Sequence, residues 1–215
     1  MKLLVFGDNH GDIESFLIVH EKVKDADVVV MLGDFTWFGQ DTEEIMALLS
    51  LFPKKVILMH GNHEHEPTVK NIAQTLDNIE FSHKEVIQVG DFDIITYGGG
   101  GFDFIDEEFE AFAEQVKKKI RDPHKTILIL HAPPHNTKLD IPFGNHHSGT
   151  HSFRKFIEEI QPLMVFAGHI HESEGKFDYI EKTLLHNPGP LGTIVDLEDL
   201  HTQRKAKKKV KVHRN

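Results

Sequence analysis

Short apolar runs in this chain alternate with small clusters of acids, histidines and amides, and this alternation constrains the fold more than any other feature. Five runs have the length and composition of buried strands, at residues 3–6, 28–32, 56–59, 127–130 and 164–167. A polar block follows each of them: Asp8-Asn9-His10, Gly33-Asp34, Gly61-Asn62-His63-Glu64, His131, and Gly168-His169-Ile170-His171. Ligands bind at the carboxyl ends of strands in open α/β sheets. The alternation therefore predicts one site assembled from five strand ends.

The segments between the first strands have the spacing of amphipathic helices. Apolar residues recur at helical intervals from Ile13 to Val23, and Asp12 is placed to cap that helix. Further helices are predicted to begin at Thr42 and to span residues 67–76, 106–121 and 151–160. Strands that alternate with helices favour an α/β fold with a parallel sheet.

Two other parts of the chain are rich in short strands. Residues 85–89 and 92–97 flank Gly90-Asp91 and are typical of an antiparallel hairpin. Strand character also marks residues 176–180, 183–185 and 192–197. Together these parts predict two sheets packed face to face, with helices outside. The glycine run at 98–101 is either a plain turn, which we favour, or a place where the backbone approaches another group closely.

Composition indicates one domain and is compatible with a reducing compartment. The 215 residues are 39% hydrophobic, which suits a single core, and we place the domain at residues 1–200. The chain has no cysteine, so disulfides and thiolate metal sites are excluded. We see no leader sequence and no apolar run of membrane-spanning length, and we therefore expect a cytoplasmic protein without a membrane partner. A homo-oligomer is compatible with this composition.

Charge is distributed unevenly along the chain. Seven of the 24 basic residues lie after position 203, so the rest of the chain carries 17 basic residues against 34 acidic ones. An acidic body disfavours broad contact with a phosphate backbone, so nucleic acid is an alternative partner but not the favoured one. We expect residues 201–215 to form a solvated, mobile, basic tail, with an anion contact as the less favoured interpretation.

The donor types in the five blocks suit divalent transition metals. Carboxylates, imidazoles and an amide oxygen form a mixed set that favours Mn²⁺, Fe, Co²⁺, Ni²⁺ or Zn²⁺ over Mg²⁺ or Ca²⁺. Two such ions about 3.5–4 Å apart can clamp a phosphate ester and hold the hydroxide that cleaves it. A carboxylate that bridges the ions keeps them close, and a further histidine can protonate the leaving alcohol.

The order of the blocks resembles that of the calcineurin-like metallophosphoesterase superfamily, in its compact prokaryotic-type branch. The shared pattern is Asp-x-His, Gly-Asp, Gly-Asn-His-Glu, a lone His and Gly-His-x-His, and it spans residues 8–171. This resemblance implies a four-layer α/β/β/α sandwich of two mixed sheets flanked by helices. It also implies two divalent metal ions per chain, with Mn²⁺ the expected metal.

The resemblance gives a role to eight residues. One metal would take Asp8, His10, Asp34 and His171, and the other would take Asp34, Asn62, His131 and His169, so that Asp34 bridges. His63 would be the general acid. The implied reaction is hydrolysis of phosphodiesters or phosphomonoesters, and the implied partner is a small phosphoester substrate.

One position departs from the pattern of many phosphomonoesterases. Those proteins continue the second block as Gly-Asp-x-x-Asp, and the last Asp orients the catalytic histidine, whereas this chain has Trp37 there. His63 then lacks that partner, and the sequence does not specify its tautomer. A diester, or a substrate with a good leaving group, demands less of this proton, so we favour phosphodiesterase activity.

Several residues near the blocks have two interpretations. His147 lies in a histidine-rich loop before the last predicted helix and is the candidate for substrate binding, with a plain polar loop as the alternative. Trp37 and Phe38 could stack on a substrate base or cover the edge of the core, and we favour burial. His60 and His65 match no ligand position, so we expect both to be spare or to support the ligands.

Three functions can be distinguished by experiment. A metal-dependent phosphoesterase is the leading hypothesis. A nuclease acting on DNA or RNA would use the same two-metal centre, and salt-dependent affinity for a polynucleotide would favour it. A non-catalytic, protein-binding scaffold of the same fold would be marked by degraded ligand blocks, and none of the five blocks is degraded.

Overall fold

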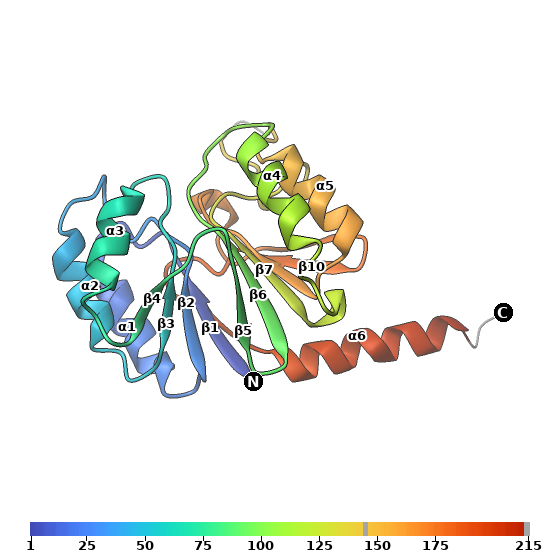
Figure 1. Cartoon of the computed structure of the whole chain (residues 1–215), viewed down its shortest axis with the longest axis horizontal. Helices are drawn as coiled ribbons and strands as arrows, with labels where there is room; N and C mark the ends of the chain where they lie inside the picture. The colour runs from blue at the N-terminus through green and yellow to red at the C-terminus, as the bar shows by residue number, and fades with distance from the viewer. Residues whose placement is uncertain (144–145, 213–215) are drawn as a thin grey trace.

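Two mixed β-sheets lie face to face, and helices cover the outer face of each (Figure 1). The computed structural model describes residues 1–143 and 146–212. The first sheet has the order β11 (Thr193–Asp196), β1 (Lys2–Phe6), β2 (Val28–Met31), β3 (Val56–Leu58) and β4 (Ile79–Phe81). The second has the order β5 (Glu85–Val89), β6 (Phe92–Tyr97), β7 (Thr126–Leu130), β8 (Met164–Phe166), β10 (Thr183–His186) and β9 (Phe177–Ile180). The predicted four-layer α/β/β/α sandwich is confirmed.

The helices divide between the two outer layers. The first sheet is covered by α1 (Ile13–Val23), α2 (Thr42–Ser50) and α3 (Glu66–Ala73), and the second by α4 (Glu107–Val116) and α5 (His151–Ile160) (Figure 1). Side-chain caps fix two of the helix starts: Asp12 accepts a hydrogen bond from Glu14 N in α1, and Asp106 accepts one from Phe109 N in α4. The cap at Asp12 was expected from the sequence, and it is confirmed.

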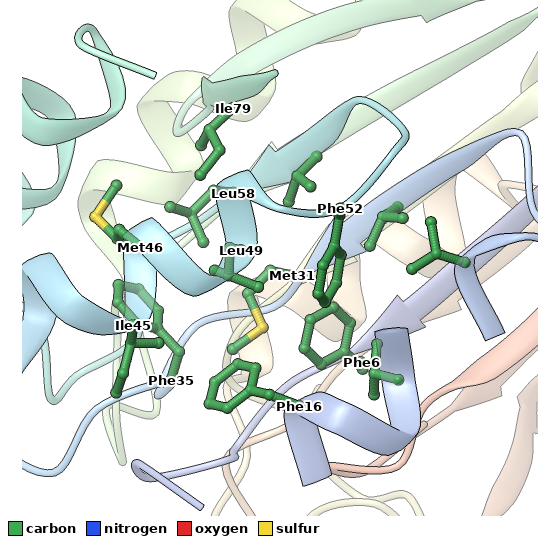
Figure 2. Packing of buried hydrophobic residues seen from close by; sticks show 14 of the residues in the cluster. Phe6, Phe16, Met31, Phe35, Ile45, Met46, Leu49, Phe52, Leu58 and Ile79 are labelled. Carbon is green, nitrogen blue, oxygen red and sulfur yellow. The ribbon is translucent and has the colours of Figure 1, made fainter. Parts of the chain in front are cut away.

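Alternation within each strand builds three separate cores. In β1, Leu4 and Phe6 face the helices of the first outer layer, whereas Leu3 and Val5 face the second sheet. Figure 2 shows the outer core beneath α1 and α2, where Phe6 packs with Phe16 and Phe52. Each such side chain contributes roughly 1.5–3 kcal/mol when fully buried. Burial on both faces explains why these strands are continuous apolar runs rather than alternating ones.

Parallel strands bring the predicted blocks to one edge of the sandwich. β1, β2 and β3 run parallel in the first sheet, and β7 and β8 run parallel in the second. One side chain joins the two edges directly: His131, after β7, donates a hydrogen bond from Nδ1 to the backbone oxygen of Leu32, after β2, at 3.1 Å. The carboxyl ends of the parallel strands in both sheets therefore meet at one place.

The C-terminal end differs from the expected mobile tail at its start. Helix α6 (Leu197–Val212) begins directly after β11 and passes residue 201 without interruption. His201 is buried and bonds through Nδ1 to His124 O, and the Arg204 guanidinium donates to the backbone oxygens of Gln161 and Pro162. Beyond these contacts the helix projects away from the sheets (Figure 1). None of the helices in the described part of the chain is long and apolar enough to cross a bilayer.

Candidate metal centre

The structure brings all seven predicted metal ligands together. Six of them fall into groups of three in which one donor atom of each residue lies within 4.8 Å of the others; these six are Asp8, His10, Asp34, His131, His169 and His171. The seventh, Asn62, joins through its Oδ1, which lies 3.0 Å from His131 Nε2. Asp34 belongs to two of the groups, one with His131 and His169 and one with His10 and His63, so its carboxylate lies between donors of both sheets.

Two imidazoles face each other on one side of Asp34. His10 donates from Nδ1 to the backbone oxygen of Thr36 at 3.2 Å, which leaves its Nε2 unprotonated in the neutral ring. That nitrogen lies 2.9 Å from Nε2 of His171 and 3.9 Å from Oδ2 of Asp34. Two ring nitrogens and a carboxylate that converge in this way fit a divalent cation.

A second convergence of donors surrounds His131. Because its Nδ1 donates to Leu32, its Nε2 points to the site, 3.4 Å from Asp34 Oδ2. Nearby, His169 Nε2 and Asp8 Oδ1 are buried without a hydrogen-bond partner among the described residues. Unpaired buried acceptors are unfavourable by about 1–3 kcal/mol each unless something supplies positive charge. These residues fit a metal ion for that reason.

Electrostatics at the site is dominated by burial and by one ion pair. Burial raises the pKa of the Asp8 carboxyl to about 6, and burial beside His131 lowers the pKa of His169 to about 4. Burial opposes charge on Asp34 and His131 too, but their attraction outweighs it. The pKa of Asp34 is held well below its usual range, and the pKa of His131 is raised to about 9. A bound cation would therefore have to displace a proton from His131.

Four of the predicted ligands have left-handed backbone conformations. Their φ angles are 60° at Asp8, 46° at His10, 50° at Asp34 and 69° at His169. Such conformations are unfavourable for residues with a Cβ, by about 1–3 kcal/mol each, and they concentrate at functional sites. These turned positions come directly at or after strand ends, where donors from different strands approach one another, such as His10 Nε2 and His171 Nε2 at 2.9 Å.

Glycines leave room for the carboxylates. A Cβ added at Gly61 would lie 2.0 Å from Asp34 Oδ1, and one added at Gly168 would lie 2.3 Å from Asp8 Oδ2. Both distances are far inside van der Waals contact, so any side chain there would displace a predicted ligand. This explains in physical terms why a glycine opens the third block and the fifth.

Glu64 ties the loops of the site together, a role that the sequence pattern did not disclose. Its buried carboxylate accepts hydrogen bonds from the backbone of Asp34, Thr36 and Gly61 at 2.8–2.9 Å, and from the Thr36 hydroxyl at 2.7 Å. Burial, opposed by these bonds, raises its pKa. The signal that could have found it is its position, since an acid directly after His63 is otherwise unexplained.

His63 is oriented by a backbone amide instead of the carboxylate that is missing at position 37. The N–H of Phe38 donates to His63 Nδ1 at 3.2 Å, so the neutral ring carries its proton on Nε2. Nε2 lies 3.9 Å from Asp34 Oδ2 and so faces the site. The structure thereby specifies the tautomer that the sequence left undetermined.

The expected burial of the neighbouring aromatics is wrong. Trp37 is 50% exposed and Phe38 is 69% exposed, and both lie in the loop between β2 and α2. Phe35, two residues before Trp37, occupies the core beneath this loop. The rings of Trp37 and Phe38 therefore remain on the outer surface. The alternative interpretation, contact with a substrate, therefore remains for these two rings.

Two other expectations have different outcomes. His147 bonds through Nδ1 to buried Asp140 at 2.7 Å. Among the described residues it makes no contact with the predicted ligands, so its role in substrate binding stays a prediction.

The glycine run is a close approach of the backbone to another group rather than a plain turn. A Cβ at Gly98 would lie 2.5 Å from His60 O, and one at Gly99 would lie 2.8 Å from His60 Nε2. His60 is thus a buried residue outside the groups that hold the predicted ligands, and it forms a separate group of possible metal donors with Glu66 and His83.

Comparison with known proteins identifies the family. The family model described as calcineurin-like phosphoesterase matches residues 1–173. This chain is a calcineurin-like phosphoesterase. The model covers all five polar blocks, and the family resemblance inferred from those blocks is confirmed. Within this phosphoesterase, the matched region ends just after the fifth block, before β9.

Other proteins are similar to this chain in sequence or in fold. An uncharacterized protein of Methanocaldococcus jannaschii is 31% identical over 199 residues, which cover 88% of each chain. The solved structure of TT1561 of Thermus thermophilus has a TM-score of 0.74 at 16% identity and covers 93% of this chain and 95% of its own. A dimetal phosphatase from Danio rerio has a TM-score of 0.61 at 12% identity and covers 90% of this phosphoesterase and 88% of its own chain. At these identities the two structures show a shared fold.

Proposed function

We propose that this phosphoesterase hydrolyses small phosphodiesters, and phosphomonoesters with good leaving groups, at a centre of two divalent metal ions. Asp8, His10, Asp34 and His171 would hold one ion, and Asp34, Asn62, His131 and His169 the other. The observation that carries the proposal is that donors from both sheets converge on Asp34. The name of the structurally similar dimetal phosphatase supports the number of ions.

The ions would supply charge neutralisation at the phosphate and an activated water. The chain's own contribution is to fix the donors before substrate arrives. Left-handed turns aim Asp8, His10, Asp34 and His169, and Glu64 holds the loop that carries Asp34. Such preorganisation avoids rearrangement during the reaction, which is a large part of the effect of an electrostatic site.

His63 would donate the proton that the leaving alkoxide needs. Its Nε2 carries a hydrogen in the tautomer set by the Phe38 amide, and this nitrogen faces Asp34. The neutral ring can donate a hydrogen bond to the leaving oxygen, but complete transfer of a proton requires the imidazolium form, because the neutral ring would otherwise be left as an imidazolate. A backbone N–H orients the ring but, unlike a carboxylate, does not stabilise a positive charge on it. This difference supports a preference for diesters and activated esters, whose leaving groups need less protonation.

The test of the proposal is metal content together with activity. Metal-stripped protein would be loaded with Mn²⁺, Co²⁺, Ni²⁺, Zn²⁺ or Mg²⁺ and assayed against monoesters, linear diesters and cyclic diesters. We expect two ions per chain in the wild type, Mn²⁺ among the activating metals, and loss of both ions in Asp34→Ala. Two ions retained in Asp34→Ala would contradict the bridging role, and no metal-dependent hydrolysis of any ester would contradict the function.

A further inference from the structure

Exposed aromatic side chains stand beside the metal ligands. Trp37 and Phe38 are 50% and 69% exposed, and Phe102 is 65% exposed. Large aromatic rings are usually buried, and several exposed near one polar site mark a binding surface more often than chance. Each of these three rings contacts the imidazole of a proposed site residue, as the ring geometry shows.

Trp37 and Phe38 form a wall around His63. The Trp37 ring centroid lies 5.1 Å from the ring of His10 and 5.1 Å from the ring of His63. Phe38 stacks on His63 at 4.3 Å, with 26° between the ring planes. Trp37 and Phe38 also meet edge to face at 5.2 Å. The two rings therefore flank the histidine from which the leaving group would receive its proton.

The loop that presents this wall is anchored rather than loose. Thr36 is fully buried, and its hydroxyl donates to Glu64 and accepts from Gly39 N at 3.1 Å. The Phe38 amide is held by His63, and Phe38 has a φ of 51°. Rings held in this way lose little conformational freedom when a ligand stacks on them, and this favours binding.

We propose that Trp37 and Phe38 form a subsite for a planar aromatic group on the leaving side of the phosphoester, an aryl ring or a nucleobase. This inference rests on the proposed function, because the phosphate must first be held beside His63. Stacking is the fitting interaction, since every flat aromatic group offers a face to these rings, and it discriminates against alkyl esters without any hydrogen-bond readout. An apolar wall next to convergent polar donors is the usual composition of a small-molecule site.

The test compares two non-hydrolysable probes that share the phosphonate and differ in one group. Phenylphosphonate and methylphosphonate are titrated calorimetrically into the full-length, Mn²⁺-loaded protein, as wild type and as the double variant Trp37→Leu/Phe38→Leu. Leucine keeps the Phe38 amide that orients His63. We expect the variant to lose about tenfold in affinity for phenylphosphonate and less than about twofold for methylphosphonate.

Two controls accompany this comparison. Phe177→Leu removes another exposed phenylalanine, 48% exposed and stacked on His186 at 3.8 Å outside the ligand set, and should leave both affinities unchanged. Trp37 is the sole tryptophan of the chain, so its fluorescence reports on the subsite directly. Phenylphosphonate should change that emission in the metal-loaded wild type, and methylphosphonate should not.

The outcomes separate the subsite from the function on which it rests. A folded, fully metal-loaded double variant that binds both probes as tightly as the wild type overturns the subsite alone, and so does an equal loss for both probes. A metal-loaded wild type that hydrolyses no ester and binds neither phosphonate overturns both proposals. A selective loss for phenylphosphonate supports the subsite.

Discussion

The two sheets contribute different chemistry to one site. Strand ends of the first sheet provide both carboxylates, the amide and the proposed acid: Asp8, Asp34, Asn62 and His63. Apart from His10, the proposed imidazole ligands come from the second sheet, after β7 and β8. We call the strand ends of the first sheet the first half of the site and those of the second sheet the second half. The first half carries the negative charge and the proposed proton donor, and the second half supplies imidazoles that are neutral when bound to a metal. Substitutions in the two halves should therefore fail in different ways.

The largest contrast should come from two histidines, one from each half. His63→Ala should lose about 10²–10⁴-fold in turnover of an alkyl diester while keeping its metals, the usual range for a general acid. His171→Ala should instead lose metal. Metal content and kcat are measured on the same preparations. With nitrophenyl esters the His63→Ala loss should shrink, and an equal loss for both leaving groups would assign His63 another role, such as binding a phosphate oxygen.

Glu64 offers a way to break the first half without touching a proposed ligand. Glu64→Ala should lower the free energy of unfolding of the metal-free protein by about 3 kcal/mol or more, because three buried backbone donors lose their acceptor. Urea unfolding measures this change. The matched control is Glu158→Ala, which removes an exposed acid paired with Arg154 on α5 and should have little effect. Equal stability of Glu64→Ala and wild type would contradict the tying role.

The ion pair between the halves predicts a pH dependence of opposite sign for folding and for metal binding. Folding raises the pKa of His131 from 6.5 to about 9, so this group's stabilisation is present below 6.5 and is lost as the pH rises through 9. Above pH about 7, Asp8 is ionised and His169 is neutral in both the folded and the unfolded protein, so neither group adds to the pH dependence of stability there. Metal-free protein should thus lose stability between pH 7 and about 9.

Metal affinity should rise over the same interval, because fewer protons compete for His131 Nε2. Calorimetry in buffers of different ionisation enthalpy would measure the proton released per metal bound near pH 7. Metal binding without proton release at that pH would show that His131 is already neutral and would contradict the ion pair.

The smallest expected effect concerns position 37 and sharpens the comparison within the first half. Trp37→Asp supplies the missing carboxylate, and the ratio of kcat/KM for monoesters over diesters should rise several-fold. Because Trp37 is half exposed, the free energy of unfolding should change by less than about 1 kcal/mol. Both quantities are measured on the same variant. A folded variant with an unchanged ratio would show that the Phe38 amide, not a carboxylate, determines how His63 works.

The sequence predicted which side chains lie together better than it predicted the surfaces around them. Fully buried strands are legible as apolar runs, so the positions of the five blocks followed from their ends. β4 has only three residues and no periodicity to detect, and it was missed. The exposure of Trp37 depends on where Phe35 turns into the core, and general burial tendencies do not carry that information.

Other features depend on contacts between segments that are distant in sequence. The role of Glu64 arises because the loops after β2 and β3 meet, and the tautomer of His63 is set by a backbone amide that no residue pattern encodes. The packed start of α6 was missed for a similar reason. Arg204 belongs by composition to a basic tail, but its hydrogen bonds reach carbonyls at the end of α5, 42 and 43 positions away.

The hydrogen bond from His131 to Leu32 has a consequence for folding. It joins the ends of β7 and β2, so the full donor set exists only after the sheets have docked. A metal ion that meets its ligands only in the native state shifts the folding equilibrium by mass action, by about 2.7 kcal/mol at a free concentration one hundred times its dissociation constant. For this phosphoesterase, metal supply would then influence how much folded protein persists as well as how fast it works.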